Sequence, residues 1–143
     1  MNSAYPGRIL LVDDDADTRS IYSEFLEDAG YVVDIAVDGE EGLAKILEGG
    51  HDLILLDIMM PKLDGIGVLK RVKEINPEVY NGPIVMLSAL DQEYIIKEAL
   101  DLGARGFLRK SGMTPDLALD KISEFLQTPA LDSSSSLNQS PQN

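Results

Sequence analysis

The feature that most constrains this chain is a regular alternation of short apolar runs with segments of helical periodicity. Each run is followed by a stretch in which apolar residues recur every three or four positions. Strands that alternate with helices in this way form a parallel sheet with helices on both faces and right-handed crossovers. The predicted fold is therefore α/β, a doubly wound five-stranded parallel sheet with five helices. The predicted strands are 9–12, 31–37, 53–56, 84–87 and 106–109.

The helical segments carry start signals of their own. Carboxylates accept hydrogen bonds from the free N–H groups of a first turn, and the aspartates at four predicted N-caps are Asp15, Asp38, Asp64 and Asp91. The last helix has Thr114 as its cap and Pro115 at its first position. The first helix is predicted to bury Ile21, Phe25 and Ala29. Gly42 lies inside the second helix, where it is expected to cost up to ~1 kcal/mol relative to Ala.

Residues 31–37 differ from the other apolar runs because one face of this predicted strand includes a charged side chain. Val33, Ile35 and Val37 alternate with a set that includes Asp34, which is typical of an edge strand. The only histidine, His51, stands in a Gly-Gly-His-Asp loop and is expected to be exposed.

Composition excludes several classes of protein. A chain of 143 residues suits one domain, and its apolar runs are too short to cross a membrane. No leader follows Met1, so a cytoplasmic location is predicted. The net charge is −13, and no basic cluster exceeds two residues, which argues against direct nucleic-acid binding. The chain has no cysteine, which excludes disulfides and thiol chemistry.

The chain changes character after residue 127. Residues 128–143 are rich in Ser, Asn, Gln and Pro. They are predicted to be a disordered tail, or a linker cut from a larger protein, and 1–127 are predicted to form the domain.

Polar residues end four of the five runs: Asp13-Asp14, Asp57, Ser88 and Lys110. The carboxyl ends of parallel strands lie at one edge of a sheet, so these side chains are expected to converge. Two like charges 4 Å apart repel by roughly 4 kcal/mol at an effective dielectric of 20, and a divalent cation relieves that cost. Oxygen ligands suit Mg²⁺, and a carboxylate beside a metal and a cation can accept a phosphoryl group.

Four motifs, LLVDDD, LLDIMMPKLDG, IVMLSA and GFLRK, occur in order and at suitable spacing. With them, residues 7–127 closely resemble the receiver domain of two-component response regulators, the family of the chemotaxis protein CheY. The resemblance implies the strand order 2-1-3-4-5. It also implies a phosphoacceptor signalling domain that catalyses only its own phosphorylation and dephosphorylation.

The same resemblance implies a role for each site residue. Asp57 takes the phosphoryl group from a sensor histidine kinase or a phosphotransfer protein. Mg²⁺ is bound by Asp14, Asp57 and the main-chain carbonyl of Met59, and by Asp13 through a water. Ser88 and Lys110 contact phosphoryl oxygens. Phe107 swings inward as Ser88 moves, which alters the surface of the fourth helix, fifth strand and fifth helix and so controls an unknown partner protein.

The sequence departs from the family pattern in three places. Ser111 follows Lys110 where the family has proline, often after a cis bond, so either the loop is trans and Lys110 is repositioned, or strain is held there. Phe107 replaces a tyrosine and offers no hydroxyl. Arg105-Gly106 stands where dimerising members carry an acidic pair, which favours a monomer or a weak dimer.

Three alternatives compete with this interpretation. Asp13, Asp15, Asp17 and Glu24 have the spacing of a calcium loop, but Thr18 stands where a glycine is needed. Asp13 and Asp15 are also spaced as in an aspartate-nucleophile phosphatase, but Asp17 breaks that motif. The third is a degenerate receiver that only binds protein, and the intact set of Asp14, Asp57, Ser88 and Lys110 argues against it.

Overall fold

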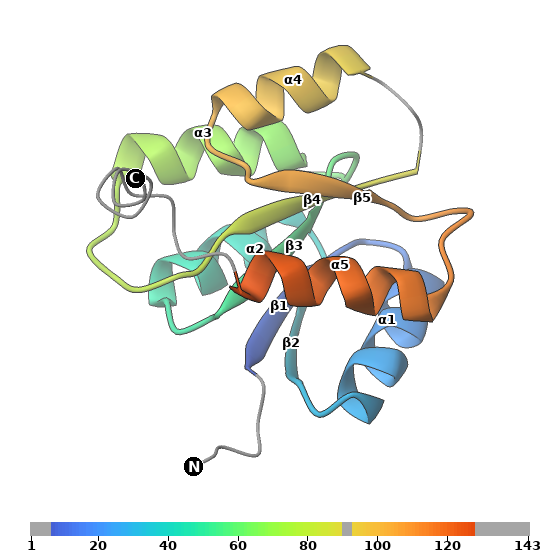
Figure 1. Cartoon of the computed structure of the whole chain (residues 1–143). Helices are drawn as coiled ribbons and strands as arrows, with labels where there is room; N and C mark the ends of the chain where they lie inside the picture. The colour runs from blue at the N-terminus through green and yellow to red at the C-terminus, as the bar shows by residue number, and fades with distance from the viewer. Residues whose placement is uncertain (1–6, 90–92, 128–143) are drawn as a thin grey trace, which may run out of the picture.

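The computed structural model describes residues 7–89 and 93–127, apart from the side chain of Glu93. Within them five strands and five helices alternate along the chain (Figure 1). All strand pairs are parallel, in the order β2-β1-β3-β4-β5, so the predicted fold class and strand order are confirmed. The cap predicted at Asp91 and the tail predicted at 128–143 lie outside the described residues. The elements are β1 (Arg8–Val12), α1 (Ala16–Asp28), β2 (Val32–Ala36), α2 (Gly39–Glu48), β3 (Leu53–Asp57), α3 (Gly65–Ile75), β4 (Ile84–Ser88), α4 (Glu93–Asp101), β5 (Gly106–Arg109) and α5 (Pro115–Gln127).

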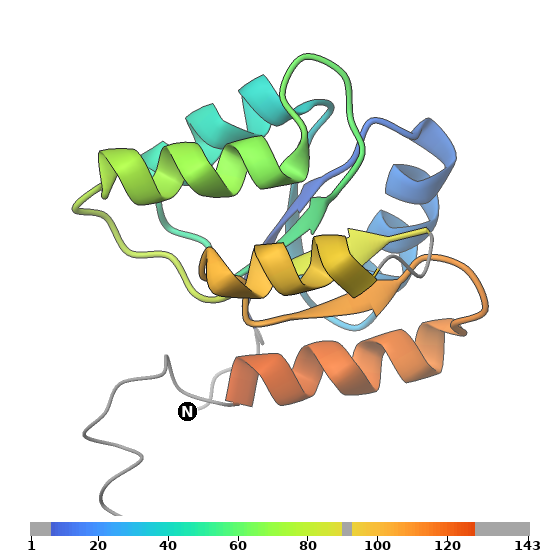
Figure 2. The same cartoon turned by 90° about the horizontal axis from the view of Figure 1, so that it is seen from above.

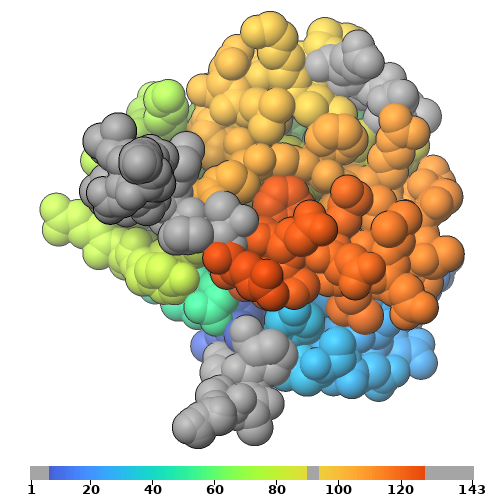
Figure 3. All heavy atoms as spheres, in the orientation of Figure 1, coloured from blue at the N-terminus to red at the C-terminus, as the bar shows by residue number. Residues whose placement is uncertain are grey.

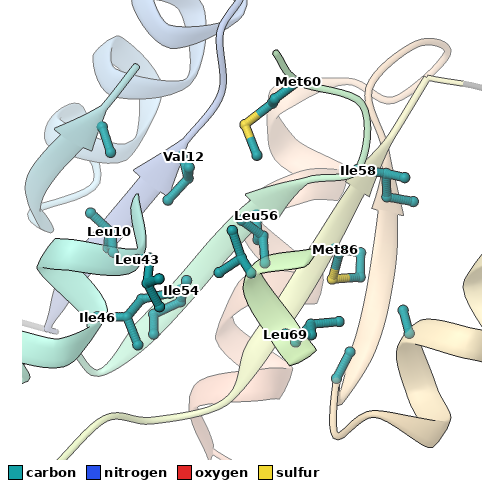
Figure 4. Packing of buried hydrophobic residues seen from close by; sticks show 14 of the residues in the cluster. Leu10, Val12, Leu43, Ile46, Ile54, Leu56, Ile58, Met60, Leu69 and Met86 are labelled. Carbon is teal, nitrogen blue, oxygen red and sulfur yellow. The ribbon is translucent and has the colours of Figure 1, made fainter. Parts of the chain in front are cut away.

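The sheet separates two apolar layers. Seen from above, α5 lies on one side of the strands and α2 and α3 lie on the other (Figure 2). Side chains of α1 and α5 pack on one face of the sheet, and side chains of α2, α3 and α4 pack on the opposite face. Figure 4 shows part of the second layer, in which Ile54 and Leu56 of β3 lie with Leu43 and Ile46 of α2.

The central strand β3 contributes to both layers at once. Ile54 and Leu56 belong to one cluster, Leu53 and Leu55 to the other, and all four are fully buried. A strand covered on both faces has no position for a polar side chain, which explains the unbroken apolar run. Asp57 is the first residue along this strand that can face the sheet edge.

Most of the predicted helix starts are present. Side-chain oxygens of Asp15, Asp38 and Asp64 accept hydrogen bonds from the backbone N–H groups of Thr18, Glu41 and Gly67, at 2.8–2.9 Å. Thr114 Oγ1 accepts from Leu117 N at 3.2 Å, and α5 begins at Pro115. These caps satisfy donors that the helices cannot pair internally.

The predicted buried face of α1 is wrong by one position. Tyr22 and Leu26 are the buried residues, whereas Ile21 is 56% exposed and Ala29 is exposed. Phe25 packs partly buried against the same cluster, with its ring centroid 4.8 Å from that of Tyr22. Tyr22, Phe25 and Leu26 have an i, i+3, i+4 spacing, which is as regular as the predicted one. Helix periodicity alone does not choose between two such stripes.

The expectation that His51 is exposed is also wrong. His51 is 2% exposed, and its Nε2 lies 3.1 Å from Asp34 Oδ2. Asp34 also pairs with Lys45 at 3.3 Å and Arg8 at 3.6 Å. Burial alone would raise the pKa of Asp34. Hydrogen bonds from His51 and Lys45 outweigh that effect and hold the pKa below its usual value. The charge that marked β2 as an edge strand is therefore neutralised locally, and β2 does lie at the sheet edge.

Gly42 is required by packing on β1. A Cβ at this position would lie 2.6 Å from Cγ1 of Val12, a fully buried and branched side chain. We expect Gly42→Ala to lower the free energy of unfolding by about 1–3 kcal/mol, because overpacking outweighs the helix-propensity gain. Urea unfolding measures this change.

Gly67→Ala is the matched control for this prediction. A Cβ on Gly67 would meet mainly the Cδ1 end of the Leu63 side chain, which can move aside, so a smaller loss is expected. A Gly42→Ala protein more stable than the parent would contradict the packing argument.

Candidate functional site

The polar residues predicted to converge do meet at one edge of the sheet. β1 leads directly into Asp13 and Asp14, β3 ends with Asp57, β4 ends with Ser88, and Lys110 follows β5. Oxygen atoms of Asp13, Asp14 and Asp57 all lie within 4.8 Å of one another. Because every strand is parallel, one edge collects side chains from four strands.

These residues differ in their exposure to solvent. Asp13 is fully buried, and Asp57 and Ser88 are each 3% exposed. Asp14 is exposed, and so is Met59, at 65%. A pocket of about 200 Å³ opens between them, lined by Asp14, Asp57, Ile58, Met59, Ser88, Ala89 and Lys110. Phe107 is outside this lining set, and its side chain is 37% exposed.

Lys110 reaches the acids even though Ser111 follows it. Its Nζ lies 2.7 Å from Asp13 Oδ2 and 3.1 Å from Asp57 Oδ1. The bond to Ser111 is trans, as are the other described peptide bonds. The backbone N–H of Lys110 donates to Ser88 O at 2.8 Å, which ties the loop to β4. A trans loop therefore leaves Lys110 in the pocket.

Charge in the pocket alters proton binding at two groups. Burial first, and then the charge of Asp13, raise the pKa of Asp57 to about 7, although Lys110 acts in the opposite direction. Burial alone would lower the pKa of Lys110, but its contacts with Asp13 and Asp57 outweigh that effect and raise it. The metal-free pocket thus holds more negative charge than one lysine balances.

The donor set fits a metal ion. Three carboxylates supply hard oxygen ligands within one ligand shell, and Asp14 stands at the open side, where solvent can complete the coordination. A divalent cation would offset the repulsion that raises the pKa of Asp57.

Comparison with known proteins places the chain in a family. Residues 9–121 match the family model of the response regulator receiver domain. The chain belongs to this family. The receiver is 40% identical over 125 residues to the chemotaxis protein CheY of Treponema pallidum, a match that covers 85% of this chain and 84% of CheY.

Other relatives of this receiver are longer. It is 46% identical over 103 residues to the transcriptional regulatory protein DltR of Streptococcus agalactiae, which covers 72% of this chain and only 45% of DltR. Among solved structures, chemotaxis protein CheY4 of Vibrio cholerae superposes with a TM-score of 0.72 at 31% identity, over 82% of this chain and 97% of that one. A CheY-like receiver domain protein from Methanospirillum hungatei gives 0.74 at 32% identity, over 84% and 93%.

The competing acidic motifs do not form sites. The calcium loop would run from Asp13 to Glu24, but α1 already begins at Ala16. The phosphatase hypothesis needs the carboxylates of Asp13 and Asp15 together, yet the Asp15 carboxylate caps α1 through Thr18.

Among the helices that the structure describes, none has the length and apolarity needed to cross a membrane.

Sequence reasoning assigned no role to Arg19. Its Nη1 donates to the backbone carbonyl of Asp13 at 2.7 Å. The only available signal was an arginine six positions after the first acid, which is too common on helices to indicate a contact.

The pKa of Asp57 leads to a testable pH dependence. Between its unfolded value of 3.8 and about 7, the native state binds the proton that the unfolded state has released. The free energy of unfolding of the metal-free protein is therefore expected to fall as pH rises through this window, by at most about 4 kcal/mol. Asp57→Asn should remove this fall and be more stable than the parent at about pH 7.5.

Urea unfolding at about pH 5 and about pH 7.5, with a chelator present, tests this expectation. Parent and variant curves that change equally with pH would contradict it.

Proposed function

We propose that this receiver accepts a phosphoryl group on Asp57 from the phosphohistidine of a sensor kinase or a phosphotransfer protein, in a Mg²⁺-dependent reaction. The observation that carries the proposal is the setting of Asp57. Asp57 is 3% exposed, and its carboxylate lies 3.1 Å from Lys110 Nζ and shares a ligand shell with Asp13 and Asp14. This combination of a nucleophile, a cation and a metal-binding set is what phosphoryl transfer to a carboxylate requires.

In the transfer, an Asp57 oxygen forms a bond to phosphorus as the phosphorus–nitrogen bond to histidine breaks. Bound Mg²⁺, held by Asp14, Asp57, the Met59 main-chain carbonyl and Asp13 through water, would neutralise charge on the phosphoryl oxygens. Lys110 pairs with one of those oxygens, and the Ser88 hydroxyl donates to another. Lys110 then exchanges its contact with Asp57 for one with the new phosphoryl group, so its charge stays neutralised.

The phosphoryl group is proposed to act on a second face of the receiver. α4, β5 and α5 form one continuous surface (Figure 3). It displays exposed apolar side chains, with Tyr94 at 74%, Leu100 at 43% and Leu117 at 46%, as expected of a protein-binding surface. Phe107 of β5, now 37% exposed, is proposed to turn inward when Ser88 moves toward the phosphoryl group.

The output is proposed to be contact with a downstream protein. The chain spans under half of DltR, a transcriptional regulatory protein, so its own output can lie in a partner or in a further part of a longer protein. Its net charge of −13 disfavours direct contact with nucleic acid. A monomeric or weakly dimeric state and a cytoplasmic location stay predictions.

The test is intact-mass measurement after incubation with acetyl phosphate and Mg²⁺. We expect the parent to gain one phosphoryl group, to need Mg²⁺ for it, and to lose the adduct on Asp57→Asn. Asp15→Asn is the control, because that carboxylate caps α1 through Thr18, outside the residues that line the pocket, and an asparagine keeps the cap. A parent that takes up no phosphoryl group under fast sampling would instead be a receiver that signals by binding alone.

Met59 provides a second prediction, on the lifetime of the adduct. Its apolar side chain lines the pocket mouth and is 65% exposed, where attacking water must pass. We expect Met59→Asn to lose the phosphoryl group several-fold faster, since an amide can orient water by hydrogen bonding. Met59→Leu should keep the parent rate, and equal rates for parent and Met59→Asn would refute the idea.

A further inference from the structure

We infer that Arg19 is a positioning residue for the metal site and acts through the peptide that joins Asp13 to Asp14. The inference rests on the proposed Mg²⁺-dependent function. Arg19 lies near the start of α1, is partly buried, and donates from Nη1 to Asp13 O at 2.7 Å. It does not face the pocket that the phosphoryl group would enter.

This hydrogen bond satisfies the backbone carbonyl of Asp13, which has no partner within the sheet. β1 ends at Val12, which pairs with Ala36 on one side and Leu56 on the other. The N–H of Asp13 still donates to Ala36 O at 3.2 Å, but its carbonyl lies past the last paired residue. Buried backbone carbonyls need a donor, and among the residues that the structure describes the guanidinium of Arg19 supplies it.

Asp13 is held at its other polar atoms as well. Its Oδ1 accepts from the N–H of Asp15 at 2.8 Å, and its Oδ2 pairs with Lys110 Nζ at 2.7 Å. Asp14 is different. Within residues 7–89 and 93–127, no hydrogen bond or ion pair holds its exposed carboxylate.

Without such a contact, the placement of the Asp14 carboxylate depends on where the backbone holds its Cα. The carbonyl of Asp13 and the N–H of Asp14 belong to one planar peptide unit. Fixing that carbonyl fixes the plane from which the Cα of Asp14 projects its carboxylate toward Asp13 and Asp57.

Substitutions at Arg19 test the role of this hydrogen bond. Arg19→Gln removes the charge and is too short to reach the carbonyl. Arg19→Lys keeps the charge but replaces the planar fork with a single ammonium, so partial rescue is expected. Arg71→Gln is the control, since Arg71 is an exposed helix arginine whose ion pair within the described part of the chain is with Glu74, at 3.6 Å.

Mg²⁺ affinity, measured by isothermal titration calorimetry, is the first readout. Residues that orient metal ligands typically change affinity by 10–100-fold, so Arg19→Gln is expected to raise the Kd for Mg²⁺ about tenfold. Arg19→Lys should raise it about threefold, and Arg71→Gln should leave it unchanged.

The second readout is one that a merely structural defect would not produce. With Mg²⁺ at the parent's Kd, a tenfold weaker site is about five times less occupied, and uptake from acetyl phosphate should be about fivefold slower in Arg19→Gln. With saturating Mg²⁺, its rate should return to that of the parent.

Parent-like Mg²⁺ affinity in Arg19→Gln would overturn the inference, and so would slow uptake that saturating Mg²⁺ does not restore. If Arg19→Gln fails to fold, parent-like affinity in Arg19→Lys has the same meaning. A parent that neither binds Mg²⁺ nor forms an adduct would remove the proposed function together with this inference. If the parent binds Mg²⁺ and forms the adduct, and Arg19→Gln does so with the same affinity and rate, only the role of Arg19 is removed.

Discussion

The interaction on which the rest of this receiver depends is the repulsion among buried carboxylates at the end of the sheet. Parallel strands bring Asp13 and Asp57 to one edge, and burial there leaves little water to separate their charges. A single cation, Lys110, bridges both acids and leaves negative charge in excess. The pocket is thus incomplete without further positive charge. A phosphoryl group brings more negative charge still, so a cation at this edge would be needed for the chemistry as well as for stability.

Much of this arrangement could be predicted because it is encoded locally. An apolar run followed by a polar residue marks both a strand and the point where it leaves the sheet, so Asp13, Asp57, Ser88 and Lys110 could be placed together from sequence. What sequence did not reveal depends on tertiary contacts. His51 can be buried because its ring nitrogen pairs with Asp34, 17 positions away in the sequence. Gly42 is needed because α2 packs closely on Val12. The face of α1 was mistaken because two stripes fit its periodicity.

The loop after β5 shows how one departure from the family pattern is tolerated. The resemblance associates proline with the position after Lys110, and Ser111 stands there instead. The lysine is nevertheless anchored from two directions. Its backbone N–H donates to Ser88 O, and its ammonium pairs with Asp13 and Asp57. The position of Lys110 thus follows from the hydrogen bond to β4 and from the charge it meets, and a proline after it is not required.

The neutralised charge on β2 has a consequence for how the receiver behaves at high concentration. An edge strand offers unpaired N–H and C=O groups to any other strand, which makes it a starting point for aggregation. On β2, Asp34 is engaged with His51, Lys45 and Arg8 beside that edge. The side chains of Asp34, Lys45 and Arg8 are still partly exposed, and an added strand that covered them would remove them from water, at a cost in desolvation free energy. We therefore expect the charged groups around Asp34 to oppose the pairing of another strand with β2.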